Sequence, residues 1–396
     1  MKKIICVLLI ASLFFSISNV YASTEEITNE KIEPLEQKQT VTTKAKVVET
    51  KEVYDRTVEN IVDKVQEVTI EVIDGDYQGQ KFNATYILSY DMDNKIMAYE
   101  LDKGNIIFVQ LTINNGEVEE VVVQDVVRQN YIIWMIALFF ISVLVIGKKQ
   151  GLKAIIGLIF TILAVFLIMI NSIYQGHSPI FVSVGTSALI IVVTFIIISG
   201  FNKKSFTAAL GTTGGVVLSG IIAFIFGMLA KLSGGQEEAV MLSMNSGNII
   251  FNFRELLFAG IVIASLGACM DVGMSIASAL DELKQHKPTM TGRELFKSGM
   301  NIGGDVIGTM TNTLILAYVG GALNLILLFM ACDMSITDII NKETIASDLI
   351  SAISGSMGVI YTIPITAGIY ALFNRNKTTY KTKPDTLLEG QRSLKL

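Results

Sequence analysis

The sequence predicts an α-helical transmembrane bundle of about seven helices, preceded by a small extracytoplasmic all-β domain. Three observations predict this fold class. Hydrophobic residues make up 51% of the 396 residues and charged residues only 17%, whereas average soluble proteins carry roughly 25% charge. The N-terminus has the layout of a secretion signal. Alternating apolar and polar residues in the first third of the chain then give way to long apolar runs.

The composition also excludes several classes of protein. A mean hydropathy of +0.54 indicates contact with lipid. Acidic residues crowd into the first third of the chain and the later loops are basic, which is not the basic patch on a soluble fold that is typical of nucleic-acid binding. The three cysteines and two histidines are dispersed, so we expect no disulfide framework, no metal site and no cofactor.

The first residues are predicted to be removed or unstructured. Residues 1–22 form a signal peptide, because Lys2 and Lys3 precede an apolar run and Ala22 offers a small residue for cleavage. An uncleaved anchor helix is the alternative, and it would leave the orientation of the chain unchanged. Residues 23–43 are polar and have no apolar period, so they are predicted to be a flexible spacer.

Residues 44–128 are predicted to form the extracytoplasmic β-rich domain. Apolar residues alternate with polar ones in successive runs, which Asp-Gly and Asn-Gly turns separate. The runs are Val68 to Val72, Phe82 to Leu88, Ile107 to Ile113 and the return through Val121 and Val123. About 85 residues can bury one modest core, so we expect a small antiparallel barrel or sandwich.

Residues 131–373 are predicted to be the transmembrane helical bundle. A helix needs roughly 20 apolar residues to cross a bilayer core of about 30 Å. Tyr131 and Trp134 lie at the start of the first run, where interfacial aromatic residues are common. The predicted spans are residues 131–147, 154–173, 180–200, 206–230, 255–280, 302–330 and 347–373.

The loop charges predict how the chain is oriented. A signal peptide places residue 131 outside the cytoplasm. The inner loops then carry 15 Lys and Arg residues and the outer loops three, which is the direction that the positive-inside rule requires. We therefore expect a multi-pass plasma-membrane protein with the β-domain outside and the tail, residues 374–396, in the cytoplasm.

Small and polar residues recur at helical spacing in the last four spans. Lipid does not drive helices together, so close packing at small residues and interhelical hydrogen bonds mark the interior of a bundle. We therefore expect these stripes to face inward, and helix packing alone explains their glycines and serines. They are Gly211, Gly215 and Ser219; Gly260, Ala264, Gly267, Asp271, Ser275 and Ser278; Asn301, Asp305, Gly308 and Asn312; and Ser351, Gly355, Gly358, Thr362 and Thr366.

Two carboxylates in these stripes are candidates for function. Asp271 lies about 15 Å along its helix from Asp281, a depth at which a carboxylate usually faces a partner or a wet cavity. Asp305 is predicted in the inner half of the bilayer, unless its span begins near Ile307 and leaves it at the interface. A break of the helix around residues 309–313 is a further alternative, because broken helices are common at transporter sites.

The leading prediction is an ion- or solute-binding site. Asp271 would bind a cation or proton and Asp305 would couple to it. Neutral ligands would come from Asn301, Thr309, Thr311, Asn312 and Thr313. The sequence has no phosphate-binding loop, nucleophile elbow or His-Glu-x-x-His motif, so we predict that the protein is not an enzyme.

Three segments of the bundle carry a family resemblance. They are Glu255 to Gly260, Gly267 to Leu280 and Gly304 to Tyr318. In these segments the chain resembles the YibE/F-like family of bacterial membrane proteins, and the likeness extends over residues 131–373. The resemblance implies a bacterial plasma-membrane protein with a β-rich stretch before its first span. It places Asp271 and Asp305 at motif positions and implies no catalytic residue and no substrate.

Two functions therefore stand beside each other. The favoured one is a secondary permease for an ion or small solute. The alternative is a non-transporting scaffold or sensor whose extracytoplasmic β-domain binds a partner. The expected partners are the lipid bilayer, a small solute or ion, and either further copies of the chain or a second membrane subunit; no nucleic acid is expected.

Overall fold

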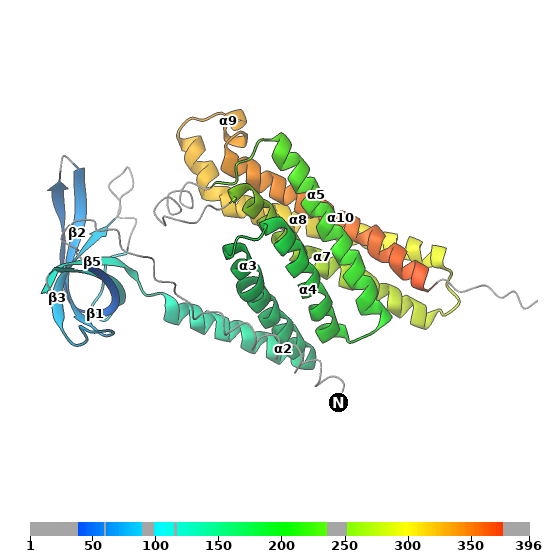
Figure 1. Cartoon of the computed structure of the whole chain (residues 1–396), viewed down its shortest axis with the longest axis horizontal. Coiled ribbons are helices and arrows are strands. Elements are labelled where there is room, and N and C mark those ends of the chain that lie inside the picture. Colours follow the sequence, from blue (N-terminus) through cyan, green and yellow to red (C-terminus); the bar gives the residue numbers. More distant parts are fainter. Residues whose placement is uncertain (1–38, 59–60, 89–98, 115–116, 236–251, 375–396) are drawn as a thin grey trace, which may run out of the picture. The chain divides into compact units, whose positions relative to one another are not determined.

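The computed structural model describes residues 39–58, 61–88, 99–114, 117–235 and 252–374. The chain divides into two compact units, Met1–Ile136 and Ala137–Leu396. The predicted β-domain followed by a helical bundle is confirmed (Figure 1). The predicted signal peptide, most of the predicted spacer and all but the first residue of the predicted tail lie outside the described residues.

Five strands form a closed barrel. They are β1 (Gln39–Val58), β2 (Ile61–Val72), β3 (Lys81–Leu88), β4 (Ile106–Asn114) and β5 (Glu117–Val126). The order around the barrel is β1-β2-β3-β5-β4, with β3 and β5 parallel. The strand β1 pairs with both β2 and β4, and register shifts let it bend between them. The OB-fold is likewise a five-stranded barrel.

The predicted alternation builds the core of the barrel. Every second residue of β4 is buried, and Ile107, Val109 and Leu111 are fully covered. The buried amide of Gln66 is satisfied, because it donates to the carbonyl of Leu101 at 3.0 Å and accepts from its N–H at 2.8 Å. Of the two predicted architectures, the structure contains the barrel and not the sandwich.

The predicted spacer, residues 23–43, extends too far, because β1 begins at Gln39. The first part of β1 pairs with β4, and Val41 lies opposite Leu111. The sequence did not indicate this part of the strand, because Val41 is its one apolar residue and the threonines around it give no apolar alternation. Threonine itself favours strands. The predicted turn between β2 and β3 is present, with Gly75 at φ 83°, a conformation that glycine adopts without strain.

Within the described part of the chain, six helical stretches are long and apolar enough to span a membrane. The first combines α2 (Gln129–Leu163), a π-helical segment (Ala164–Ile170) and α3 (Asn171–Tyr174). The others are α4 (Pro179–Ser199), α5 (Lys203–Leu229), α7 (Phe253–His286), α8 (Gly292–Ala331) and α10 (Glu343–Phe373). The short α9 (Ile336–Ile340) lies between the last two.

The first stretch accounts for two of the seven predicted spans. The backbone of Lys148 leaves helical geometry, at φ 46° and ψ −127°, so the stretch consists of two arms. Gly151 permits this bend, because a Cβ there would lie 2.2 Å from the carbonyl oxygen of Val143. The predicted number of about seven spanning helices is confirmed in this sense.

The centre of the bundle is formed by α5, α7 and α10 (Figure 1). The core includes the fully buried Ile276, Val359 and Ile363. The helix α4 packs against α5 and α7, whereas α8 packs mainly against α10. Only 6% of the most apolar part of α8 is buried, against 50% for α7 and for α10. The helix α8 is therefore the least covered of the six.

Candidate functional site

The small-residue stripes of α5 and α10 meet each other. A Cβ on Gly211 would lie 1.9 Å from Thr366 Oγ1, and a Cβ on Gly215 would lie 1.8 Å from Thr362 Oγ1. Only glycine leaves room for these hydroxyl groups, so the two backbones approach closely. The prediction that the stripes of the fourth and seventh spans face the interior is confirmed.

This interior is polar but uncharged. The hydroxyl of Thr212 donates to the carbonyl of Cys269 on α7 at 3.3 Å, and that of Thr362 donates to Gly358 at 2.8 Å. The hydroxyls of Ser219 and Thr366 are buried and have no hydrogen-bond partner among the described residues. No charged side chain is buried in the described part of the bundle, so the candidate charges lie elsewhere.

Asp271 lies on the outer side of α7. It is exposed together with Gly260, Ala264, Gly267 and Ser275. A Cβ on Gly260 or on Gly267 would meet no atom within 4 Å. The prediction that this stripe faces the bundle interior is therefore wrong for the single chain. The opposite face of α7 carries the larger side chains that pack on α4, α5 and α10.

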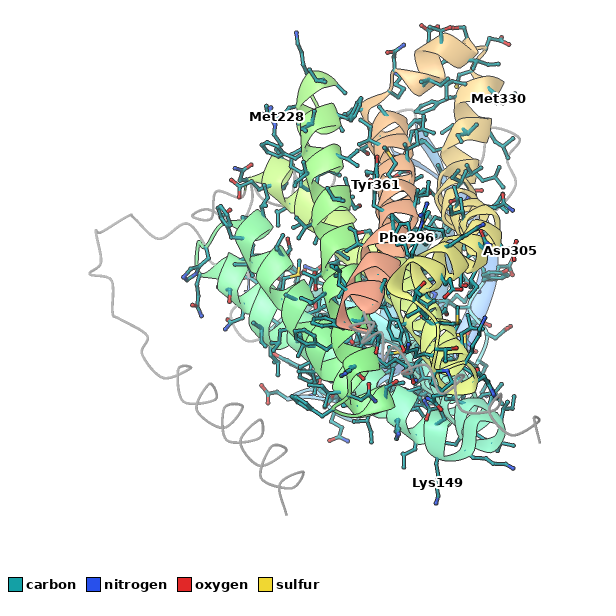
Figure 2. All side chains as sticks on the ribbon, turned by 90° about the vertical axis from the view of Figure 1, so that its right-hand side faces the viewer. Lys149, Met228, Phe296, Asp305, Met330 and Tyr361 are labelled. Carbon is teal, nitrogen blue, oxygen red and sulfur yellow. The ribbon has the colours of Figure 1, made fainter. Side chains whose placement is uncertain are left out.

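Asp305 lies on the outer side of α8, and Figure 2 shows it at the edge of the bundle. Asn301, Gly304, Gly308 and Asn312 are exposed on the same face. The predicted inward orientation of this stripe is also wrong for the single chain. The reason is a second set of glycines, Gly299 and Gly303, which makes the contact with α10 instead.

The helix α8 is continuous, and the predicted alternative of a break around residues 309–313 is wrong. Thr309 Oγ1 donates to the carbonyl of Val306 at 3.1 Å, and Thr313 Oγ1 donates to that of Thr309 at 2.9 Å. This bonding to the preceding turn lets polar residues occupy an apolar helix. The hydroxyl of Thr311 is buried and has no partner among the described residues.

The structure does not pair the two carboxylates. Neither Asp271 nor Asp305 makes a hydrogen bond or an ion pair with another described residue. They lie on the outer sides of different helices. A lone carboxylate in hydrocarbon is costly and normally has a partner or a wet cavity. The single chain is therefore an incomplete setting for both groups.

The sequence did not indicate two polar contacts that join distant parts of the bundle. Glu343 Oε1 accepts from the N–H of Ser233 at 2.6 Å, from its hydroxyl at 2.7 Å and from the N–H of Gly234 at 2.9 Å. Near the other end of α10, the buried Tyr370 donates to Asp281 at 3.0 Å. The partners are 89 to 110 residues apart, so no local pattern signals these bonds.

The barrel carries two exposed ion pairs among the described residues. Hydrogen bonds from Lys51 at 2.7 Å and Tyr54 at 2.9 Å hold the pKa of Glu67 below its ordinary value. Arg128 does the same for the pKa of Asp125 at the end of β5. Among all residues that the structure describes, no three His, Cys, Asp or Glu side chains could hold a metal ion.

Comparison with known proteins assigns the family. The family model described as YibE/F-like protein matches residues 135–376, which is more than half of the chain. The match includes Asp271 and Asp305 and leaves out the barrel. No curated protein and no solved structure matches the chain. With its spanning helices and this match, the chain belongs to the YibE/F-like family of membrane proteins.

Proposed function

We propose that the protein is a secondary permease for an ion or small solute, in which Asp271 and Asp305 bind the transported or coupling cation. It would lie in the bacterial plasma membrane with the barrel outside and the C-terminus in the cytoplasm. One observation carries the proposal: two carboxylates lie on spanning helices without a polar partner among the described residues. Ionisable residues in such places usually bind ions or relay protons.

Asp271 is the better candidate of the two carboxylates because it lies deeper in the membrane-spanning part of its helix. The helix α7 has 34 residues, which corresponds to a length of about 51 Å, and Asp271 lies near its midpoint. The short side chain of aspartate does not reach the headgroups from there. Its charge must therefore be balanced within the membrane by a proton, a cation or another protein surface.

Asp305 has the more suitable neighbours. It lies about one third of the way along the 40 residues of α8. Asn301 and Asn312 on the same face offer amide oxygens, and the bonded hydroxyls of Thr309 and Thr313 can still accept. Carboxylate, amide and hydroxyl oxygens are ligands that hard cations prefer.

The interior of the bundle is uncharged, which restricts the path that an ion could take through the protein. The contact of α5 with α10 is closed by glycine and threonine, and the described part of the bundle buries no charged side chain. A path through this contact would lack a charged group for a cation. The outer faces of α7 and α8 carry both carboxylates, so the proposed path runs along them once another surface shields them from lipid.

Transport by the reconstituted protein tests the proposal. Vesicles that contain the purified chain would be given a pH gradient or gradients of Na⁺, K⁺ or Mg²⁺. We expect Asp271→Asn to reduce the flux at least about 10-fold and Asp305→Asn to reduce it less. Glu282→Gln and Asp333→Asn are the matched controls, because both acids are exposed near ends of the same helical segments. Undiminished flux in Asp271→Asn under every gradient would contradict the proposal.

A second candidate function is binding by the barrel. The strand order with parallel β3 and β5 favours it, because OB-fold barrels bind ligands on the face of their second and third strands. Deletion of residues 39–126 discriminates between the two functions. A deletion variant that still transports but no longer complements cells that lack the protein supports a sensor or scaffold, whereas full complementation supports the permease alone.

A further inference from the structure

We propose that two copies of the chain associate through the outer face of α8, defined by Asn301, Gly304, Asp305, Gly308 and Asn312. The contact would place Asp305 of each copy beside the Asp305 of the other. The inference rests on the proposed function only for the role given to Asp305. The association itself follows from the surface of α8 and is testable without transport.

The outer face of α8 differs from a surface made for lipid. The exposed residues of the first arm of α2 include Ile132, Leu138 and Ile141, and its Ser142 hydroxyl donates to the carbonyl of Leu138 at 2.8 Å. Lipid covers such a surface well. The outer face of α8 instead presents two amides and a carboxylate that bond to no other described residue, and lipid cannot satisfy them.

Two other glycines of α8 show how closely another helix packs on a glycine-containing side of this helix. A Cβ on Gly299 would lie 2.7 Å from Ala367 Cβ, and a Cβ on Gly303 would lie 2.1 Å from Ile363 Cγ2. This pair admits α10 to close contact. Gly304 and Gly308 have the same four-residue spacing on another side, and a Cβ on either would meet nothing within 4 Å. The helix therefore carries one occupied and one open contact of the kind that brings membrane helices together.

A second copy fits this open contact chemically. All copies insert in the same orientation, so two α8 helices meet in parallel about a two-fold axis and each residue lies near its own counterpart. Asparagine suits such an arrangement, because its amide N–H donates and its carbonyl accepts. Asn312 of one copy can thus pair with Asn312 of the other.

The outer face of α8 is large enough for a specific interface between two copies. The 40 residues of α8 make a helix of about 60 Å, and the exposed side is about 10 Å wide. Two such sides would bury up to roughly 1,200 Å² in total, which reaches the lower limit of specific interfaces. The low coverage of α8, 6% of its most apolar part, leaves this area available in the described chain.

The dimer would also complete the site of the proposed function. Two aspartates close together across a two-fold axis either share a proton, so that the pair carries one charge, or hold a cation between them. Asp305 alone offers one carboxylate, whereas the pair offers two, and Asn301 of each copy lies one turn away with a further amide oxygen. The cation would be held between the chains.

Disulfide cross-linking in membranes tests the contact. Leu316 lies one turn beyond Asn312 on the same side of α8 and is 59% exposed. In a cysteine-free background, we expect oxidation of Leu316→Cys to give at least about 5-fold more covalent dimer than Ile221→Cys, which lies on α5 and is 48% exposed. Equal yields from the two variants, or a link to a different protein, would overturn the proposal.

Counting copies gives an independent readout. Photobleaching of labelled protein in vesicles should show two copies per particle for the wild type. Gly304→Leu combined with Gly308→Leu should weaken the association at least about 10-fold without unfolding the chain, because both positions face open space. Wild-type particles with one copy would overturn the dimer. If such particles still transported and Asp271→Asn abolished the flux, the permease would stand without it.

Discussion

The contact between α5 and α10 and the outer face of α8 both contain glycines four residues apart, but the glycines of the contact are covered and those of the outer face are open. In the first, Gly211 and Gly215 lie under threonine hydroxyls, and in the second, Gly304 and Gly308 lie open. The spacing of the glycines is four residues in both. The comparison teaches that a small-residue period identifies a helix surface made for close approach. It does not identify whether the approaching surface belongs to the same chain.

The largest effect should follow from filling the covered surface. In Gly215→Val the Cβ would lie 1.8 Å from Thr362 Oγ1 and 2.7 Å from the carbonyl oxygen of Gly358. Because one of these atoms is backbone, the two helices must move apart. We expect a destabilisation of about 3 kcal/mol or more, at the upper end for overpacked cores, measured as a lower thermal midpoint of the purified chain in detergent.

The control for this prediction is the open surface. Gly308→Val introduces the same side chain where no atom lies within 4 Å. Its thermal midpoint in monomeric detergent solution should stay close to that of the wild type, since valine and glycine have similar, low helix propensities. Equal destabilisation by the two variants would contradict the packing of α5 on α10.

The helices could be predicted from the sequence because a bilayer imposes a length on each apolar run. The strands could be predicted because the barrel buries every second residue. Which face of a helix is covered could not be predicted in the same way. On α8 the pairs Gly299 with Gly303 and Gly304 with Gly308 lie side by side in the sequence, and only the first meets α10.

The same ambiguity limited how far the candidate site could be predicted from the sequence. The sequence indicated Asp271 and Asp305 as unusual, since charge in an apolar run is unusual wherever it faces. Their outward orientation depends on where the bulky residues of α7 and α8 lie relative to three other helices. The run from Thr309 to Thr313 suggested a broken helix, because a single sequence does not show that these hydroxyls bond to their own backbone.

A smaller effect should follow from removing one polar group from the open surface. Asn312→Leu deletes the amide that we propose to pair across the two-fold axis. Interhelical hydrogen bonds in membranes contribute about 1 kcal/mol, so the dissociation constant of the dimer should rise about 5-fold. Energy transfer between labelled copies in vesicles at varied protein density measures it.

Asn324 offers the matched control for this variant. It is also an exposed asparagine on α8, but it lies about 120° around the helix from Asn312. Asn324→Leu should therefore leave the dissociation constant unchanged. Equal weakening by Asn312→Leu and Asn324→Leu would mean that the association depends on the polarity of α8 in general and not on its outer face.

The smallest effect is expected for Gly308→Ala, and its sign should be opposite to that of Gly211→Ala. Alanine stabilises a helix by about 0.5–1 kcal/mol relative to glycine when nothing opposes it. In monomeric detergent solution, Gly308→Ala should therefore raise the thermal midpoint slightly. Gly211→Ala should lower it, because its methyl group would lie 1.9 Å from Thr366 Oγ1. A drop for Gly308→Ala in the monomer would show that a part of the same chain covers the outer face of α8, which would leave no room there for a second copy.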